Sequence, residues 1–203
     1  MLKRPINTYF IDLVITGVKG YKDAIQKYPN NEALCRAFKY LIGQTVRQYI
    51  LLPQHMYVSV EAMILWEEIT SDDIKLAGYR KQITCDKLVT QKIVKTYKGA
   101  QKLNKEITLR AGDKFVFNDI FHEDHVIPVV YFVDELIRLD LEELTEEKVE
   151  DILDGMYIAK ILKEEDRSLP RTKRPLTFEE VLATTYKSIE LQPLVKNDRL
   201  RLV

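Results

Sequence analysis

The spacing of apolar residues changes near residue 105, and this change restricts the folds that the chain can adopt. Before it, apolar residues recur at three- and four-residue steps, which predicts helices over residues 8–52, interrupted at 29–31, and near 59–66 and 85–97. After it, residues 107–109 and 115–117 flank a glycine-containing turn, which predicts a β-hairpin. The sequence therefore predicts an α+β protein with a mostly helical N-terminal region.

Helical and strand patterns alternate over the rest of the chain. Pro128 suits the first turn of a helix over 129–137, and Thr145 suits the start of a second that ends at residues 154–155. Residues 156–162 are strand-like, and Pro170 would soon stop a helix that begins at Lys163. A final helix over 177–186 precedes a basic tail. These patterns predict a strand followed by a helix near residue 163.

The composition excludes several classes of protein. The chain has 203 residues and no net charge, and a chain of this size buries roughly 70% of its unfolded surface, so it needs no disulfides. Two distant cysteines exclude a four-cysteine zinc ribbon, and no apolar run approaches a membrane span of ~18 residues, so we expect a cytoplasmic protein without a membrane partner. Phosphate-loop, Gly-x-Ser-x-Gly and dinucleotide motifs are missing, which argues against motors, serine hydrolases and Rossmann oxidoreductases.

Charge is distributed in blocks. Residues 75–114 carry eleven Lys or Arg against three acids, whereas residues 119–166 carry sixteen acids against four basic residues. Solvated helix faces are the simpler interpretation of such blocks. The sharper interpretation is an acidic metal pocket within a basic surface that faces phosphates, as in a metal-dependent nuclease.

The four consecutive residues from His122 to His125 carry the most chemical information. Neighbouring side chains of a strand diverge, so Asp124 could bind a metal while His125 faces a water molecule. Neutral imidazole can accept a proton from that water, and carboxylate oxygens suit Mg²⁺ or Mn²⁺. His122 and Glu123 are possible accessory residues of the same site.

The sequence from Asp124 to Pro128 resembles the first motif of HNH endonucleases, the Asp/Glu-His-x-x-Pro signature of the ββα-metal fold. Residues 157–169 are similar to the strand and helix that close that fold. The resemblance covers residues 114–169, and the long spacing between its two halves requires a helical insertion. It implies an endonuclease of the restriction or phage-defence type that hydrolyses DNA with a single divalent ion, Mg²⁺ or Mn²⁺ rather than zinc.

The resemblance also implies roles for individual residues. Asp124 would bind the metal, His125 would activate water, and Asp166 would complete the metal site, with Glu165 or Glu164 as substitutes. Lys163 or Arg167 would neutralise the phosphate. Restriction-type cleavage of both strands would imply a homodimer.

Three segments follow from this interpretation: a helical region over 1–104 for substrate recognition or dimerisation, a nuclease core over 105–170, and a basic C-terminal segment over 171–203. Basic residues on both sides of the core would bind the backbone of DNA, or of RNA, and make binding sensitive to salt. The candidates are Lys92, Lys95, Lys98, Lys102, Arg171, Lys173 and Arg174.

Two other interpretations remain open at this stage. His122 and His125 could together bind zinc with a distant carboxylate. Alternatively, the protein is a non-catalytic helical adaptor or nucleic-acid-binding protein in which residues 122–125 form a polar turn. The nuclease interpretation requires the carboxylates of Asp124 and Asp166 to lie close enough to share one ion.

Overall fold

The computed structural model describes residues 5–49, 55–170 and 174–194. The chain forms two compact units, one from residues 1–52 and 127–156 and the other from residues 53–126 and 157–203. Each unit combines two separate stretches of chain. The mixture of helices and strands confirms the α+β class.

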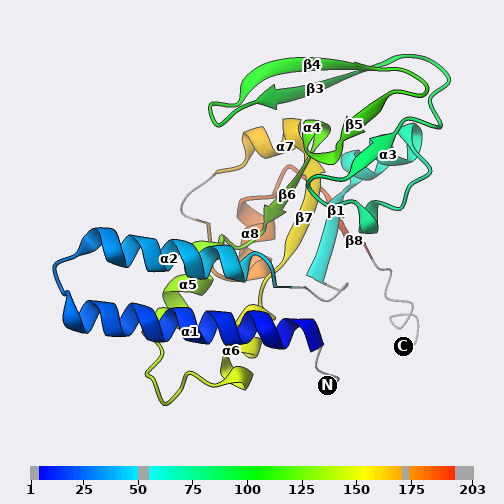
Figure 1. The fold of residues 1–203 in the computed structure, drawn as a ribbon. Coiled ribbons are helices and arrows are strands. Elements are labelled where there is room, and N and C mark those ends of the chain that lie inside the picture. Colours follow the sequence, from blue (N-terminus) through cyan, green and yellow to red (C-terminus); the bar gives the residue numbers. More distant parts are fainter. Residues whose placement is uncertain (1–4, 50–54, 171–173, 195–203) are drawn as a thin grey trace, which may run out of the picture. The chain divides into compact units, whose positions relative to one another are not determined.

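The first unit is helical. It contains α1 (Pro5–Lys27), α2 (Glu32–Val46), α5 (Val129–Arg138) and α6 (Glu146–Leu153), and α1 packs against the other three (Figure 1). The helix starts follow local chemistry, because the side chain of Asn31 caps α2 and that of Thr145 caps α6. The predicted helices over 129–137 and from 145 are confirmed, and those over 8–52 are confirmed as far as Val46; residues 50–52 lie outside the described residues.

The second unit is built around a four-stranded sheet with the order β6-β7-β1-β8. Its strands are β1 (Met56–Ser59), β6 (Phe121–His125), β7 (Ile158–Leu162) and β8 (Leu191–Pro193); β7 pairs in parallel with β1 and antiparallel with β6. Its helical segments are α3 (Val60–Ile69), η2 (Ile74–Leu76), α4 (Phe117–Ile120), α7 (Lys163–Ser168) and α8 (Phe178–Thr184). The helix α7 begins directly after β7 and packs against both β6 and β7.

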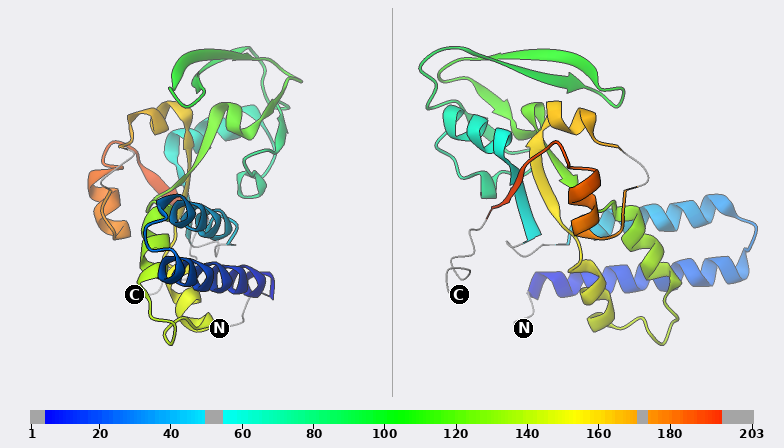
Figure 2. Two further views of the ribbon diagram at one scale, coloured as in Figure 1. Left: turned by 60° about the vertical axis from the view of Figure 1, so that its left-hand side comes forward. Right: turned by 180° about the vertical axis from the view of Figure 1, so that it is seen from behind.

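Two small two-stranded sheets complete this unit. Strands β3 (Lys92–Lys98) and β4 (Leu103–Leu109) form a hairpin, and β2 (Gln82–Thr84) pairs with β5 (Lys114–Val116). The hairpin packs against α7 through β3 (Figure 2). It therefore lies beside the helix that follows β7.

Two predictions about this region are wrong. Residues 85–97 are not a helix, because their second half is β3, in which Val94 and Thr96 are buried while Lys95 between them is exposed. The strands at 107–109 and 115–117 do not pair with each other either. The turn around Gly112 (φ +82°) instead hydrogen-bonds to Cys85, which leaves β4 to pair with β3 across a tighter turn.

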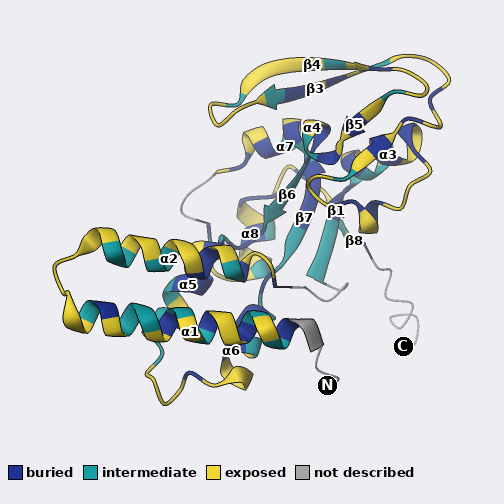
Figure 3. Cartoon of the chain, viewed as in Figure 1, coloured by how far each residue is buried: buried dark blue, intermediate teal, exposed yellow. Residues whose placement is uncertain are grey.

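An aromatic cluster forms the core of this unit. The rings of Phe117 and Phe121 stack with their centres 5.1 Å apart, and Trp66 packs edge-on against Phe121 at 5.3 Å. All three side chains are buried, and Figure 3 shows buried stretches in dark blue along α3 and α4. Their packing fixes the start of β6 against α3, and so positions the polar residues that follow Phe121.

Lys160 is a buried cation in the middle of β7. Its ammonium group donates hydrogen bonds to the carbonyl oxygens of Ile74 (2.7 Å), the first residue of η2, and Ala77 (2.5 Å), the residue that follows it. Burial lowers its pKa, while the carboxylate of Glu123, 3.6 Å away, opposes this effect. Lys160 therefore ties the sheet to the loop that contains η2.

Replacing Lys160 with methionine should lower the free energy of unfolding by about 2–4 kcal/mol, because the buried carbonyls and Glu123 would lose their partner. Urea unfolding followed through the fluorescence of Trp66, the single tryptophan, measures this change. Lys98→Met removes an exposed lysine by the same substitution and should cost no more than about 0.5 kcal/mol. Equal effects of the two substitutions would contradict a structural role for Lys160.

Among the described residues, no helix combines the length and the apolar character needed to cross a membrane.

Candidate metal centre

Three potential metal ligands converge between β6 and α7. His122 and Asp124 are alternate residues of β6, and Asp166 lies on α7, directly beyond the strand that pairs with β6. Their ligand atoms all lie within 4.8 Å of one another. Alternation along the strand and the immediate start of α7 therefore bring together two carboxylates and an imidazole.

Asp166 is held by two residues of the β3–β4 hairpin. Its Oδ2 accepts a hydrogen bond from the Tyr97 hydroxyl (2.6 Å) and lies 2.8 Å from the Lys102 ammonium, which also donates to the Asp166 carbonyl oxygen. Burial favours the protonated carboxyl, but these hydrogen bonds and the charges of Lys102 and His122 lower the pKa of Asp166 overall. The carboxylate is therefore kept ionised and oriented.

The hairpin turn explains how Lys102 reaches this position. Lys102 adopts a left-handed backbone conformation (φ +50°), which is uncommon for a residue with a side chain. Its side chain is only 11% exposed. The turn therefore directs a cation inward, where its contacts with Asp166 compensate for the unfavourable backbone.

Asp124 is held by residues from the C-terminal part of the chain. Its Oδ2 lies 2.5 Å from Nη1 of Arg174 and accepts a hydrogen bond from the hydroxyl of Tyr186. Nη1 of Arg174 also donates to the carbonyl oxygen of His125. Burial and the nearby Asp124 charge raise the pKa of Tyr186, so this hydroxyl remains a donor. Both carboxylates of the cluster thus have fixed donors on one side.

His122 is the most open member of the cluster. Its side chain is 28% exposed, against 14% for Asp124 and 8% for Asp166, and its Nε2 lies 3.9 Å from Oδ1 of Asp166. The imidazole is therefore accessible to solvent, while the carboxylates are more deeply buried.

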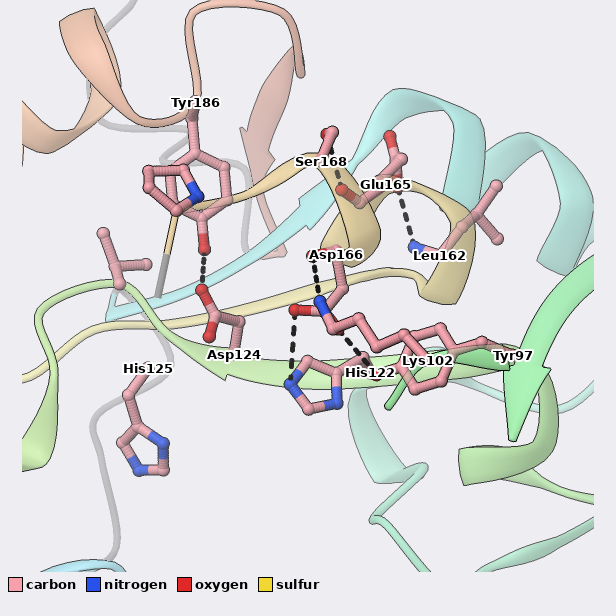
Figure 4. Close-up of polar contacts among 12 residues, drawn as sticks. Tyr97, Lys102, His122, Asp124, His125, Leu162, Glu165, Asp166, Ser168 and Tyr186 are labelled. Atoms are coloured by element: carbon pink, nitrogen blue, oxygen red, sulfur yellow. Dashed lines mark hydrogen bonds and ion pairs between the residues drawn. The ribbon is translucent and has the colours of Figure 1, made fainter. Parts of the chain in front are cut away.

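His125 points away from this cluster. It is the last residue of β6, and its ring lies on the side of the strand away from Asp124 and Asp166 (Figure 4). Residues three apart on a strand face opposite sides, so His122 and His125 do not combine into one zinc site. The imidazole that the structure brings to the carboxylates is His122, not the residue that the sequence analysis favoured.

The other proposed acidic residues lie outside the cluster. Glu165 accepts hydrogen bonds from the Ser59 hydroxyl (2.6 Å) and the Leu162 backbone N–H (2.7 Å), and burial raises its pKa despite these bonds. This contact caps α7 instead of facing Asp124. Glu123 lies beside Lys160, on the opposite face of β6 from the cluster.

The proposed phosphate-neutralising residues have different environments. Lys163 is buried, its ammonium group lies 5.0 Å from the centre of the Tyr97 ring, and burial lowers its pKa. Arg167 is exposed on α7. Lys163 therefore supports the packing of the hairpin on α7, whereas Arg167 is accessible to a ligand.

The proposed nucleic-acid-binding residues also divide into inward and outward groups. Lys102 and Arg174 point inward to the two carboxylates, and Lys92 pairs with Glu68. Lys95 and Lys98 are exposed on the hairpin. Arg171 and Lys173 lie outside the described residues.

Sequence reasoning did not identify Tyr97 and Tyr186 as partners of the two carboxylates. Both contacts join residues more than sixty positions apart, and no local pattern marks them. Lys102 was expected to bind a nucleic acid, and only its position in a tight turn after Gly99 could have suggested an inward direction.

Comparisons with protein-family models, with curated proteins and with solved structures found no match.

The Tyr186 contact gives a test of ligand orientation. Tyr186→Phe removes only the hydroxyl that orients Asp124 and leaves the local charge unchanged, so Mn²⁺ affinity should fall about tenfold. Calorimetric titration of Mn²⁺ measures the change, and Tyr79→Phe, at an exposed tyrosine, is the matched control. Unchanged affinity in Tyr186→Phe would show that the hydroxyl does not orient a metal ligand.

Proposed function

We propose that this protein is a divalent-metal-dependent endonuclease that hydrolyses phosphodiester bonds of DNA. The observation that carries the proposal is the convergence of Asp124 and Asp166, far apart in the sequence, with His122. The two carboxylates offer the oxygen ligands that suit Mg²⁺ or Mn²⁺. The donor set therefore fits the ion that the resemblance to HNH endonucleases implies.

The local topology supports the same proposal. The strands β6 and β7 are antiparallel, and α7 follows β7 without a break. A ββα-metal motif has this order of two antiparallel strands and a helix. Residues 126–157, which include α5 and α6, would then be the insertion that the resemblance requires.

We assign the residues of the site different roles. Asp124 and Asp166 would hold the ion, because they are the deeper groups and fixed donors orient both of them. A divalent ion held there supplies Lewis acidity that stabilises the negative charge developing on the phosphate oxygens. His122 would accept a proton from the attacking water at Nε2, because it is the exposed imidazole on the same face.

The charges of Lys102 and Arg174 prepare the site for this role. Two carboxylates within a few ångströms repel each other unless cations or a metal offset their charge. Each carboxylate has one such cation at 2.5–2.8 Å. The cluster can therefore hold its geometry before an ion binds, which lowers the cost of binding.

Nicking of supercoiled plasmid with Mg²⁺ or Mn²⁺ tests the proposal. Wild-type protein should nick DNA with either ion and stop when a chelator removes it, and a single-stranded RNA substrate run in parallel tests the choice of DNA. Cutting at fixed positions on both strands would support a restriction enzyme that acts as a homodimer. No nicking with either ion, on methylated or unmethylated plasmid, would contradict the proposal.

One observation favours a second candidate, a non-catalytic nucleic-acid-binding protein. Asp124 and Asp166 each already have a cationic partner, so the cluster can also be a network of ion pairs that needs no metal. In that case wild-type protein would bind nucleic acid in a salt-dependent manner and would not bind Mn²⁺.

A further inference from the structure

A groove runs between the β3–β4 hairpin and α7. Its volume is about 510 Å³, and all seven residues that line it are polar or charged. Three of them are the cations Lys95, Lys105 and Arg167, and two are the acids Glu106 and Glu164. The groove therefore presents charge to solvent instead of an apolar surface.

The cations of the groove are available to a ligand. Lys105 and Arg167 are exposed, and no carboxylate among the described residues pairs with either of them. Lys95 lies 3.7 Å from Glu164, but both side chains are more than half exposed, so this pair contributes little stability. The hairpin carries five lysines and one glutamate between residues 92 and 109, which makes the surroundings of the groove positive.

The groove adjoins the candidate metal centre. Glu164 and Arg167 line it from α7, and Asp166 lies between them on the same helix. Tyr97 and Lys102 of the hairpin hold Asp166, which fixes the hairpin beside the centre (Figure 4). A strand bound in the groove would therefore pass along the helix that carries Asp166.

We propose that this groove binds the sugar–phosphate backbone of a nucleic-acid strand next to the phosphodiester that is hydrolysed. The inference rests on the proposed function for its position relative to the reaction, but binding itself requires no metal. Lysine and arginine neutralise phosphates without reading bases, and the lining residues offer no ring on which a base could stack. The groove therefore provides affinity for the strand and positions its backbone, whereas recognition of a particular base sequence would depend on other residues.

The test is binding of a short labelled oligonucleotide, followed by fluorescence anisotropy in the presence of a chelator so that no cleavage occurs. The double variant Lys105→Ala and Arg167→Ala should bind about tenfold more weakly than wild type. The slope of its log affinity plotted against log salt concentration should be smaller in magnitude by about 2, because two phosphate contacts are lost. Single-stranded DNA, duplex DNA and RNA of the same sequence show which nucleic acid the groove prefers.

The matched control removes two exposed lysines of the same unit that do not line the groove, Lys87→Ala and Lys187→Ala. It should bind as wild type does, and its net charge equals that of the groove variant. The proposal is overturned if the groove variant binds no more weakly than this control, or if wild type binds none of the three nucleic acids.

The outcomes for the groove and for the proposed function are separable. In one outcome, wild-type protein binds nucleic acid, the groove variant binds about tenfold more weakly, and neither cleaves DNA. This result would contradict the proposed endonuclease activity and support nucleic-acid binding in the groove. In the other outcome, both proteins cleave DNA in a metal-dependent reaction with the same KM. This result would contradict nucleic-acid binding in the groove and support the proposed endonuclease activity.

Discussion

Replacing Asp166 with alanine should lower the rate of metal-dependent DNA cleavage about 10³-fold and weaken Mn²⁺ binding at least about 100-fold. The carboxylate is one of two that would hold the ion, and the hairpin fixes it through Tyr97 and Lys102. Plasmid nicking measures the first effect and calorimetric titration of Mn²⁺ measures the second. Both effects should appear together, since they have one cause.

Two control variants sharpen this experiment. Glu164→Ala removes an exposed carboxylate of the same helix and should leave Mn²⁺ binding unchanged. Asp166→Asn keeps an oxygen ligand at the same position and should retain more activity than Asp166→Ala. The fluorescence of Trp66 during urea unfolding shows whether each variant is folded. Full activity in a folded Asp166→Ala protein would exclude Asp166 from the site.

The second large effect is expected at His122. Replacing it with alanine should lower the cleavage rate at saturating Mn²⁺ by about 10²–10⁴-fold, because the water would lose its proton acceptor. His125→Ala should retain most of the activity, since its ring lies on the other side of β6. Single-turnover nicking with both variants compares the two imidazoles directly.

Mn²⁺ affinity distinguishes the possible roles of His122. A proton acceptor can be removed with little change in metal affinity, whereas loss of a third metal ligand would weaken binding as strongly as loss of Asp166. The reverse result, an inactive His125→Ala and an active His122→Ala, would contradict the assignment of His122. That result would instead assign the role of proton acceptor to His125, as the resemblance to HNH endonucleases implies.

The sequence contained enough information for much of the local structure near the site. The order of a strand, the helices after Pro128 and Thr145, a second strand and α7 follows from spacing, caps and proline positions. The same order placed Asp124 and Asp166 at the ends of elements that could meet. Their convergence itself was predicted from the resemblance to HNH endonucleases, because no local pattern alone brings Asp124 and Asp166 together.

Orientation and long-range pairing could not be predicted in this way. Alternation along β6 groups His122 with Asp124, whereas the resemblance to HNH endonucleases led to His125 as the proton acceptor. The helix expected at 85–97 is a loop and β3, because Val94 and Thr96 are buried by pairing with β4 and by α4. That error also hid the inward direction of Tyr97 and Lys102.

The most direct test of the central claim is titration of Mn²⁺ into wild-type protein, Asp124→Ala and Asp166→Ala, with Glu165→Gln as the control. We predict one ion per chain in wild type, strongly weakened binding in both aspartate variants, and unchanged binding in the control, because Glu165 caps α7. Absence of Mn²⁺ binding to wild type, or equal binding by wild type and the folded aspartate variants, would contradict a metal centre at Asp124 and Asp166.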